Sequence, residues 1–190
     1  MRAVVTEPND GLLWIPREKR FYENACFFLA TSAGVRGVYS PLELVRESRY
    51  HDLGHPVSDE DPQHLRTIRR VSLILSAALL VYQGRHVTQG SWQIDLTPFM
   101  IISPPQIVQR RGELPQIIRL VTDGTHFELI KTSKSIFTHD PPREKWKEIE
   151  RAYRLIMNEC VYSDDESLEL SKPRKSLYQI ERPLRRKVSW

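Results

Sequence analysis

Cysteine is scarce in this sequence, which holds only Cys26 and Cys160, far apart and each among apolar residues. A disulfide-stapled scaffold would need more cysteines, and a zinc site would need ligands in closely spaced pairs. Both thiols are therefore predicted to be buried in a protein of a reducing compartment.

Long apolar runs are also lacking. The longest run, VSLILSAALLVY at residues 71–82, spans twelve residues and includes two serines, whereas a membrane-spanning helix needs about 20. The opening residues MRAVVTEPND turn acidic before any apolar core develops, so we predict no signal peptide. Any contact with a membrane is therefore expected from one side of the bilayer.

No metal-binding motif is complete. His51, Asp52 and His55 lie close together, with His64 beyond them. Two histidines four residues apart would need a helix to bring both imidazoles to one metal, and a glycine and a proline interrupt the helix here. We predict a solvated loop and no bound metal.

Catalytic motifs are missing as well. Asp123, Glu128 and Lys131 resemble the carboxylate and lysine set of metal-dependent nucleases. Glu128 and Lys131 are three residues apart, however, so on a strand their side chains would point to opposite faces. Asp123 is better explained by a turn. No strand-turn-helix elbow surrounds a serine or cysteine, and no glycine-rich phosphate loop is present. We therefore predict a protein that is not an enzyme and needs no cofactor.

The composition is that of a globular domain: of 190 residues, 40% are hydrophobic and 27% are charged. We predict one domain over residues 1–165 and a flexible, acidic-to-basic tail over residues 166–190.

Two main helices are predicted. The first covers about residues 62–83 and ends at Gly84, because apolar residues recur there at helical spacing: Leu65, Ile68, Val71, Leu75, Leu79 and Tyr82. The second covers about residues 142–159. A shorter helix starts at Ser40, the N-cap, with Pro41 first in the helix and Glu43 closing a capping box. Residues 25–30 are a strand or a short helix.

Strands follow the first main helix. The segment SWQIDLTPFMII (91–102) and the segment LPQIIRLV (114–121) are rich in β-formers, and Asp123-Gly124 is a typical hairpin pair between β-prone arms. The predicted fold class is α+β: a single compact domain with a small antiparallel sheet packed with the two main helices.

A basic cluster, Arg66, Arg69 and Arg70, lies on the first turns of the predicted 62–83 helix. It is either a solvated face paired with the acidic residues 59–61 or a docking patch for phosphate, from a lipid headgroup or an RNA backbone. Arg110 and Arg111, in a proline-rich loop, would extend such a patch.

The clearest functional signal is the C-terminal tail. Its last twenty residues carry a charge of +6, so residues 1–170 carry −2 of the total +4. Such a tail suits an anionic membrane, a nucleic-acid backbone or a nuclear-import receptor, or serves only as a solubilising end. The residues concerned are Lys172, Arg174, Lys175, Arg182, Arg185, Arg186, Lys187 and Trp190.

In order along the chain, several segments resemble the matrix proteins of rhabdoviruses. DGLLWIP (10–16) is similar to their entry segment, and the segment from FYENACFF to VRGVYSPLELVRES (21–48) is similar to a strand and a following helix. HLRTIRRVSLILSAALLVYQG (64–84) resembles their central apolar helix. The SWQIDLTPFMII segment, the Asp123-Gly124 hairpin and REKWKEIERAYRLIMNEC (143–160) follow in the same order. The family's lysine-rich N-terminus and Pro-Pro-x-Tyr motif are not found in this sequence.

The resemblance implies a non-enzymatic structural protein that self-associates, condenses the viral nucleocapsid and binds the inner face of an anionic membrane in virion assembly and budding. Its expected places are the virion, beneath the envelope, and the host cytoplasm and membrane periphery. The tail would replace the missing N-terminal lysines, and an import receptor would add the host nucleus. The alternative is a nucleic-acid-binding or host-interacting accessory module without an assembly role.

Overall fold

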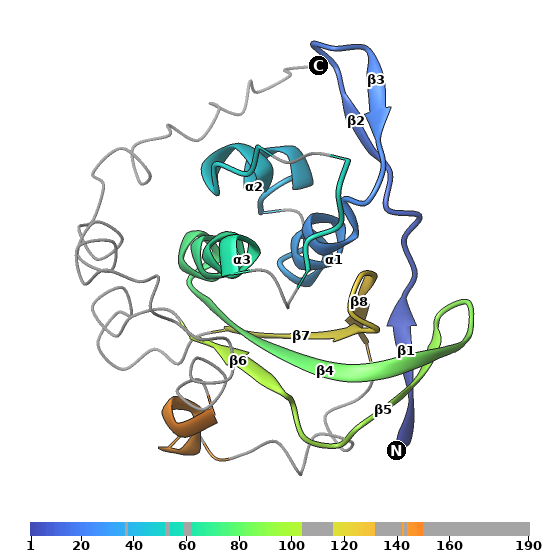
Figure 1. Cartoon of the computed structure of the whole chain (residues 1–190), viewed down its shortest axis with the longest axis vertical. Helices are drawn as coiled ribbons and strands as arrows, with labels where there is room; N and C mark the ends of the chain where they lie inside the picture. Colours follow the sequence, from blue (N-terminus) through green and yellow to red (C-terminus); the bar gives the residue numbers. More distant parts are fainter. Residues whose placement is uncertain are drawn as a thin grey trace, which may run out of the picture.

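The computed structural model describes residues 1–36, 38–51, 54–58, 62–103, 116–131, 142 and 144–149. In this part of the chain, strands and helices mix in one α+β arrangement with a compact core (Figure 1). The elements are β1 (Arg2–Glu7), β2 (Leu13–Ile15), β3 (Arg20–Tyr22), α1 (Cys26–Gly34), α2 (Pro41–Glu47), α3 (Pro62–Leu75), β4 (Ala77–Thr88), β5 (Ser91–Ile94), β6 (Met100–Ile102), β7 (Gln116–Thr122) and β8 (Phe127–Ile130). Residues 144–149 form a further short helix.

Five strands close into a barrel-like ring. The order is β5-β1-β8-β7-β4, and β4 pairs back onto β5, while β6 attaches to β4 outside the ring. The sheet was predicted to be antiparallel, and this is wrong for one pair: β4 and β7 run parallel from Ala77↔Gln116 to Gln83↔Thr122. The remaining pairs described in the ring are antiparallel.

Strand β4 closes the ring because it changes partners along its length. Its first half pairs with β7, and Gly84–Thr88 pair with β5. Gly84 lies at this change, where a Cβ atom would come within 2.5 Å of Val121 Cγ2 and 3.1 Å of the Gln93 carbonyl oxygen. A side chain at position 84 would therefore collide with both neighbouring strands.

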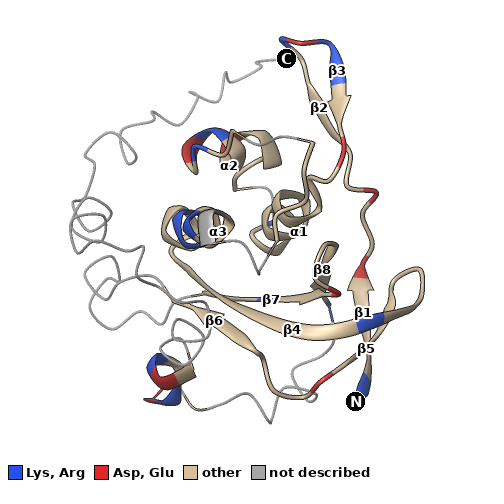
Figure 2. Cartoon of the chain, viewed as in Figure 1, with Lys and Arg blue, Asp and Glu red and all other residues tan. Residues whose placement is uncertain are grey.

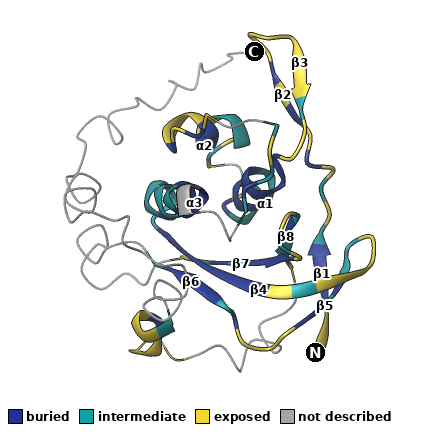
Figure 3. Cartoon of the chain, viewed as in Figure 1, coloured by how far each residue is buried: buried dark blue, intermediate teal, exposed yellow. Residues whose placement is uncertain are grey.

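The apolar core lies on both faces of the ring (Figure 3). Leu79 and Val81 of β4 face the helix side, where α1 and α3 cover the outer face of the ring and α2 packs on these two helices, whereas Leu80 and Tyr82 face the interior. Trp146 of the 144–149 helix is also buried and belongs to the interior cluster. Residues 77–82 of β4 are consequently all buried.

The predicted helix over residues 62–83 is wrong in its second half. Helix α3 ends at Leu75, Ser76 takes a positive φ of 48°, and β4 begins at Ala77. A strand buried on both faces has no polar alternation, so its continuous apolar run resembles a buried helix. Gly84 therefore lies inside a strand and does not end a helix.

Other local predictions are confirmed. Ser40 caps α2 with a complete capping box, and residues 25–30 belong largely to helix α1. β7 and β8 form the predicted hairpin, in which Gly124 has a φ of +111°. Of the predicted 142–159 helix, residues 144–149 are helical, and residues 150–159 lie outside the described residues. The 166–190 tail also lies outside them.

The substitution Gly84→Ala tests the closure of the ring. It is expected to lower the free energy of unfolding by about 1–3 kcal/mol, the usual cost of overpacking a filled site. Equilibrium urea unfolding would measure the change. Gln83→Ala, next to it and exposed, is the control and is expected to stay within about 0.5 kcal/mol of the wild type. Equal stability of the two variants would contradict a crowded crossing at Gly84.

Candidate functional site

The β2–β3 hairpin projects from the body of the protein (Figure 1). Trp14 pairs with Phe21 across its two strands, and their rings lie 5.0 Å apart. Because side chains alternate along a strand, Leu13 and Ile15 face the core, while Trp14 and Phe21 are 44% and 60% exposed. The hairpin thus holds an aromatic pair on its solvent face.

Basic residues lie at the tip of the same hairpin. Arg17, Lys19 and Arg20 lie in or beside the turn of the hairpin with Glu18, and all four are exposed (Figure 2). The Arg20 guanidinium forms an ion pair with Glu18 at 3.2 Å and lies 4.1 Å from the ring centroid of Tyr22. The hairpin therefore combines exposed aromatic rings with a net positive charge.

The root of the hairpin is held by a few hydrogen bonds. The Ala25 amide donates to the Gly11 carbonyl oxygen at 2.8 Å, and both Gly11 and Asn24 have positive φ angles. The Asn9 side-chain amide donates to the Phe127 carbonyl oxygen at 2.9 Å. A pocket of about 290 Å³ lies at this root, and Asp10, Gly11, Leu12, Glu23, Asn24, Cys26, Thr125 and His126 line it.

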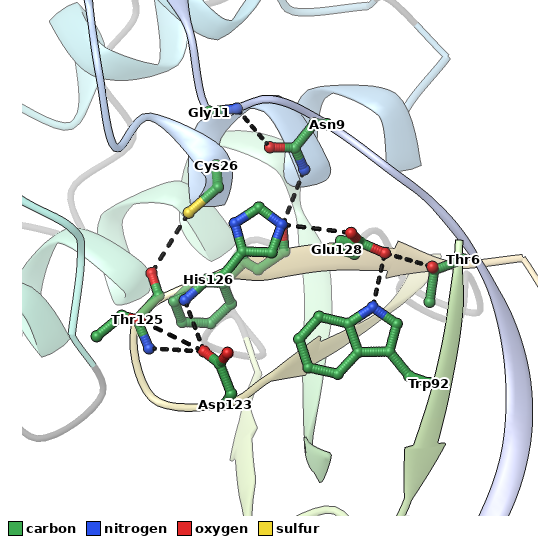
Figure 4. Close-up of polar contacts among 10 residues, drawn as sticks. Thr6, Asn9, Gly11, Cys26, Trp92, Asp123, Thr125, His126 and Glu128 are labelled. Atoms are coloured by element: carbon green, nitrogen blue, oxygen red, sulfur yellow. Dashed lines mark hydrogen bonds and ion pairs between the residues drawn. The ribbon is translucent and has the colours of Figure 1, made fainter. Parts of the chain in front are cut away.

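A buried polar cluster lies beside the pocket (Figure 4). Glu128, only 3% exposed, accepts a hydrogen bond from Trp92 Nε1 at 2.7 Å and another from the Thr6 hydroxyl. His126 Nε2 lies 3.3 Å from the other carboxylate oxygen, and the His126 ring stacks on the Trp92 indole. One carboxylate thus connects strands β1, β5 and β8.

Cys26, the first residue of α1, does not have the surroundings of an activated nucleophile. Its thiol is buried and lies 3.5 Å from the Thr125 carbonyl oxygen, to which it donates. Burial raises the pKa of the Cys26 thiol above the ordinary value. Because the thiolate is the reactive form, this environment favours an inert thiol.

The three residues of the nuclease-like set serve separate structural roles. Burial by itself raises the pKa of Asp123, but the His126 and Thr125 amides donate to its carboxylate and bring that pKa below the usual value. Lys131 forms an ion pair with Glu7 at 2.6 Å, and Glu128 faces inward. Among the described residues, no group of three or more His, Cys, Asp or Glu side chains is arranged to hold a metal ion.

Part of the predicted basic patch makes contacts within the protein. Arg66, Arg69 and Arg70 are half-buried on α3, and each takes part in an interaction. Arg70 Nη1 donates to the Ser48 carbonyl oxygen at 3.3 Å, at the C-terminal end of α2, where a cation is favourable. Arg110 and Arg111 lie outside the described residues, as do Lys172, Arg174, Lys175, Arg182, Arg185, Arg186, Lys187 and Trp190.

The histidines of the predicted loop are not brought together as ligands. His64 Nδ1 accepts the Ser58 amide hydrogen at 2.9 Å, and its ring packs against Tyr50. His51 and His55 are exposed, and Asp52 lies outside the described residues.

The sequence did not lead us to predict the exposed aromatic hairpin or the buried Glu128 cluster. The hairpin had a signal, because the short polar turn Arg17–Lys19 separates the apolar run LLWIP from the aromatic pair in RFY. The Glu128 cluster had none, since Thr6, Trp92 and Glu128 come from distant parts of the chain.

No family model, curated protein or solved structure matches this chain. The resemblance to rhabdovirus matrix proteins therefore stays a prediction. In the part of the chain that the structure describes, every helix is too short or too polar to cross a membrane.

Replacing Glu128 tests the buried cluster. Glu128→Ala is expected to lower the free energy of unfolding by about 2–5 kcal/mol, because each buried donor left without an acceptor costs about 1–3 kcal/mol. Glu128→Gln keeps one acceptor oxygen and is expected to cost less. Urea unfolding measures both, with Glu47→Ala, an exposed carboxylate on α2, as the control. If Glu128→Ala were as stable as that control, the cluster would not hold the ring together.

Proposed function

We propose that this protein is a non-enzymatic structural protein of the matrix type, which binds an anionic membrane surface from one side through the β2–β3 hairpin. The observation that supports this function is the exposed Trp14–Phe21 pair beside the cationic turn. In this proposal it self-associates and links a viral nucleocapsid to the inner face of the envelope.

The chemistry of the hairpin fits a lipid interface. Tryptophan is enriched at the boundary between headgroups and acyl chains. Each cation close to an anionic bilayer contributes about 1 kcal/mol. Arg17 and Lys19 lie in the turn of the same hairpin, a few residues from Trp14 and Phe21, so both contributions would act on one projecting element. If the protein also self-associates, many such weak contacts act together and its binding to the membrane becomes firm.

A nucleic-acid-binding accessory module is the alternative. It would rely on phosphate contacts, and its candidate patch on α3 is half-buried, with Arg70 bonded to the end of α2. The exposed apolar rings of the hairpin are better suited to lipid than to a phosphate backbone. For the C-terminal tail, three binding partners stay as predictions: a membrane, RNA and an import receptor.

The double substitution Trp14→Ala and Phe21→Ala tests the hairpin. It is expected to weaken binding to phosphatidylserine-containing vesicles by about tenfold or more, the effect of losing about 1.4 kcal/mol. Co-sedimentation over a range of lipid concentrations measures the change. The matched control is Val38→Ala with Val87→Ala, which removes two exposed apolar side chains elsewhere. Equal binding by the two double variants would refute the hairpin as the membrane contact.

Deleting residues 171–190 separates the tail from the hairpin. If the tail supplies the long-range attraction, the shortened chain binds anionic vesicles more weakly, and the difference disappears at high salt. Neutral vesicles and single-stranded RNA are tested beside them. Loss of RNA binding alone would assign the tail to nucleic acid, and unchanged binding to both would exclude it from either role.

A further inference from the structure

Strand β3 has an outer edge, and no other strand pairs with it in the part of the chain that the structure describes. Its sheet consists of β2 and β3. Because the N–H and C=O groups of successive residues alternate between the two sides of a strand, some of those in Arg20–Tyr22 point away from β2. The hairpin projects from the body (Figure 1), and Arg20 and Phe21 are exposed. Such an edge is a template for pairing with a further strand.

The sequence along this edge is complementary to itself. In an antiparallel pair of two β3 strands with Phe21 opposite Phe21, Lys19 lies opposite Glu23 and Arg20 lies opposite Tyr22. Each of these pairs occurs twice, because the pairing has a two-fold axis. Opposite charges and cation–aromatic contacts across strands both stabilise a sheet. Arg20 already lies 4.1 Å from the Tyr22 ring centroid within one chain, so the same kind of contact would recur between copies.

Other pairings of the same two edges match less well. An antiparallel pair centred on Arg20 places two guanidinium groups opposite each other, and a parallel pair in register brings the same like charges side by side. A shift by one residue places Arg20 opposite Phe21. Because opposite residues share a face, this shift turns the Trp14–Phe21 faces of the two copies to opposite sides of the sheet. The charges and the aromatic rings therefore favour the pair centred on Phe21.

We propose that the outer edge of β3 binds β3 of a second copy of this chain, antiparallel and with Phe21 opposite Phe21. The two hairpins then form one four-stranded sheet. Trp14 already lies opposite Phe21 within each hairpin, so the rings of both copies form a single row on one face. This row doubles the aromatic surface offered to a membrane. That consequence rests on the proposed function, whereas the pairing of two copies does not.

Reversing the charges tests this pairing in the full chain without lipid. Sedimentation velocity from micromolar to near-millimolar concentration is expected to show wild-type monomers in equilibrium with dimers, since a short edge makes a weak interface. Lys19→Glu and Glu23→Lys are each expected to weaken dimerisation by about tenfold, because each places two like-charge pairs in the interface. An equimolar mixture of the two variants is expected to dimerise as the wild type does, because opposite charges then meet again at both positions.

The matched control is Arg36→Glu, which makes the same change of charge at an exposed residue whose φ of 52° is close to the 51° of Lys19. Arg36 follows the end of α1 that packs against β7, so this variant is expected to dimerise as the wild type does. A wild type that stays monomeric, single variants that dimerise as well as the control, or a mixture that stays monomeric would each overturn the pairing.

The mixture also separates the pairing from a folding defect, because mixing two misfolded variants would not restore a dimer. Vesicle binding is measured on the same proteins in a separate experiment. Dimers that do not bind anionic vesicles would refute the membrane function and leave the pairing intact. Monomers that still bind vesicles through the hairpin would refute the pairing alone.

Discussion

The whole fold depends on one strand that is buried on both faces. β4 supplies side chains to the helix-facing core and to the ring interior, and it joins β7 to β5 by changing partners at Gly84. Without this change the sheet would stay open, and the interior cluster around Trp92 would be exposed to water. The missing side chain at position 84 is therefore a requirement of the closure.

The closed ring also explains how a carboxylate can be buried. Burying a charged group is costly unless hydrogen bonds replace its hydration. In the ring, β1 and β5 bring the Thr6 hydroxyl and the Trp92 indole N–H to Glu128 of β8. His126, placed at the edge of the same cluster, extends this polar network towards the surface pocket. The cluster thus reaches from the interior of the ring to the edge of this pocket.

The ring buries apolar side chains, whereas the hairpin exposes some of them. The ring and its helices bury most of the described apolar residues, whereas the hairpin exposes Trp14 and Phe21 beside basic residues. Stable proteins expose such aromatic side chains together chiefly where they meet a partner or a lipid surface. This division is the physical basis of the proposed membrane contact. The C-terminal tail would add attraction by charge, without needing a fixed structure.

Local chemistry was readable from the sequence alone, because its causes lie within a few residues. The Ser40 capping box, the Asp123-Gly124 hairpin, the mixed α+β class and the unequal distribution of charge all depend on neighbours along the chain. The helix predicted through residue 83 failed because the burial of residues 77–82 on two faces depends on distant partners. The parallel β4–β7 pair, the closed ring, the Glu128 cluster and the position of His126 were decided by the tertiary structure, since each requires contacts between segments that no local pattern relates.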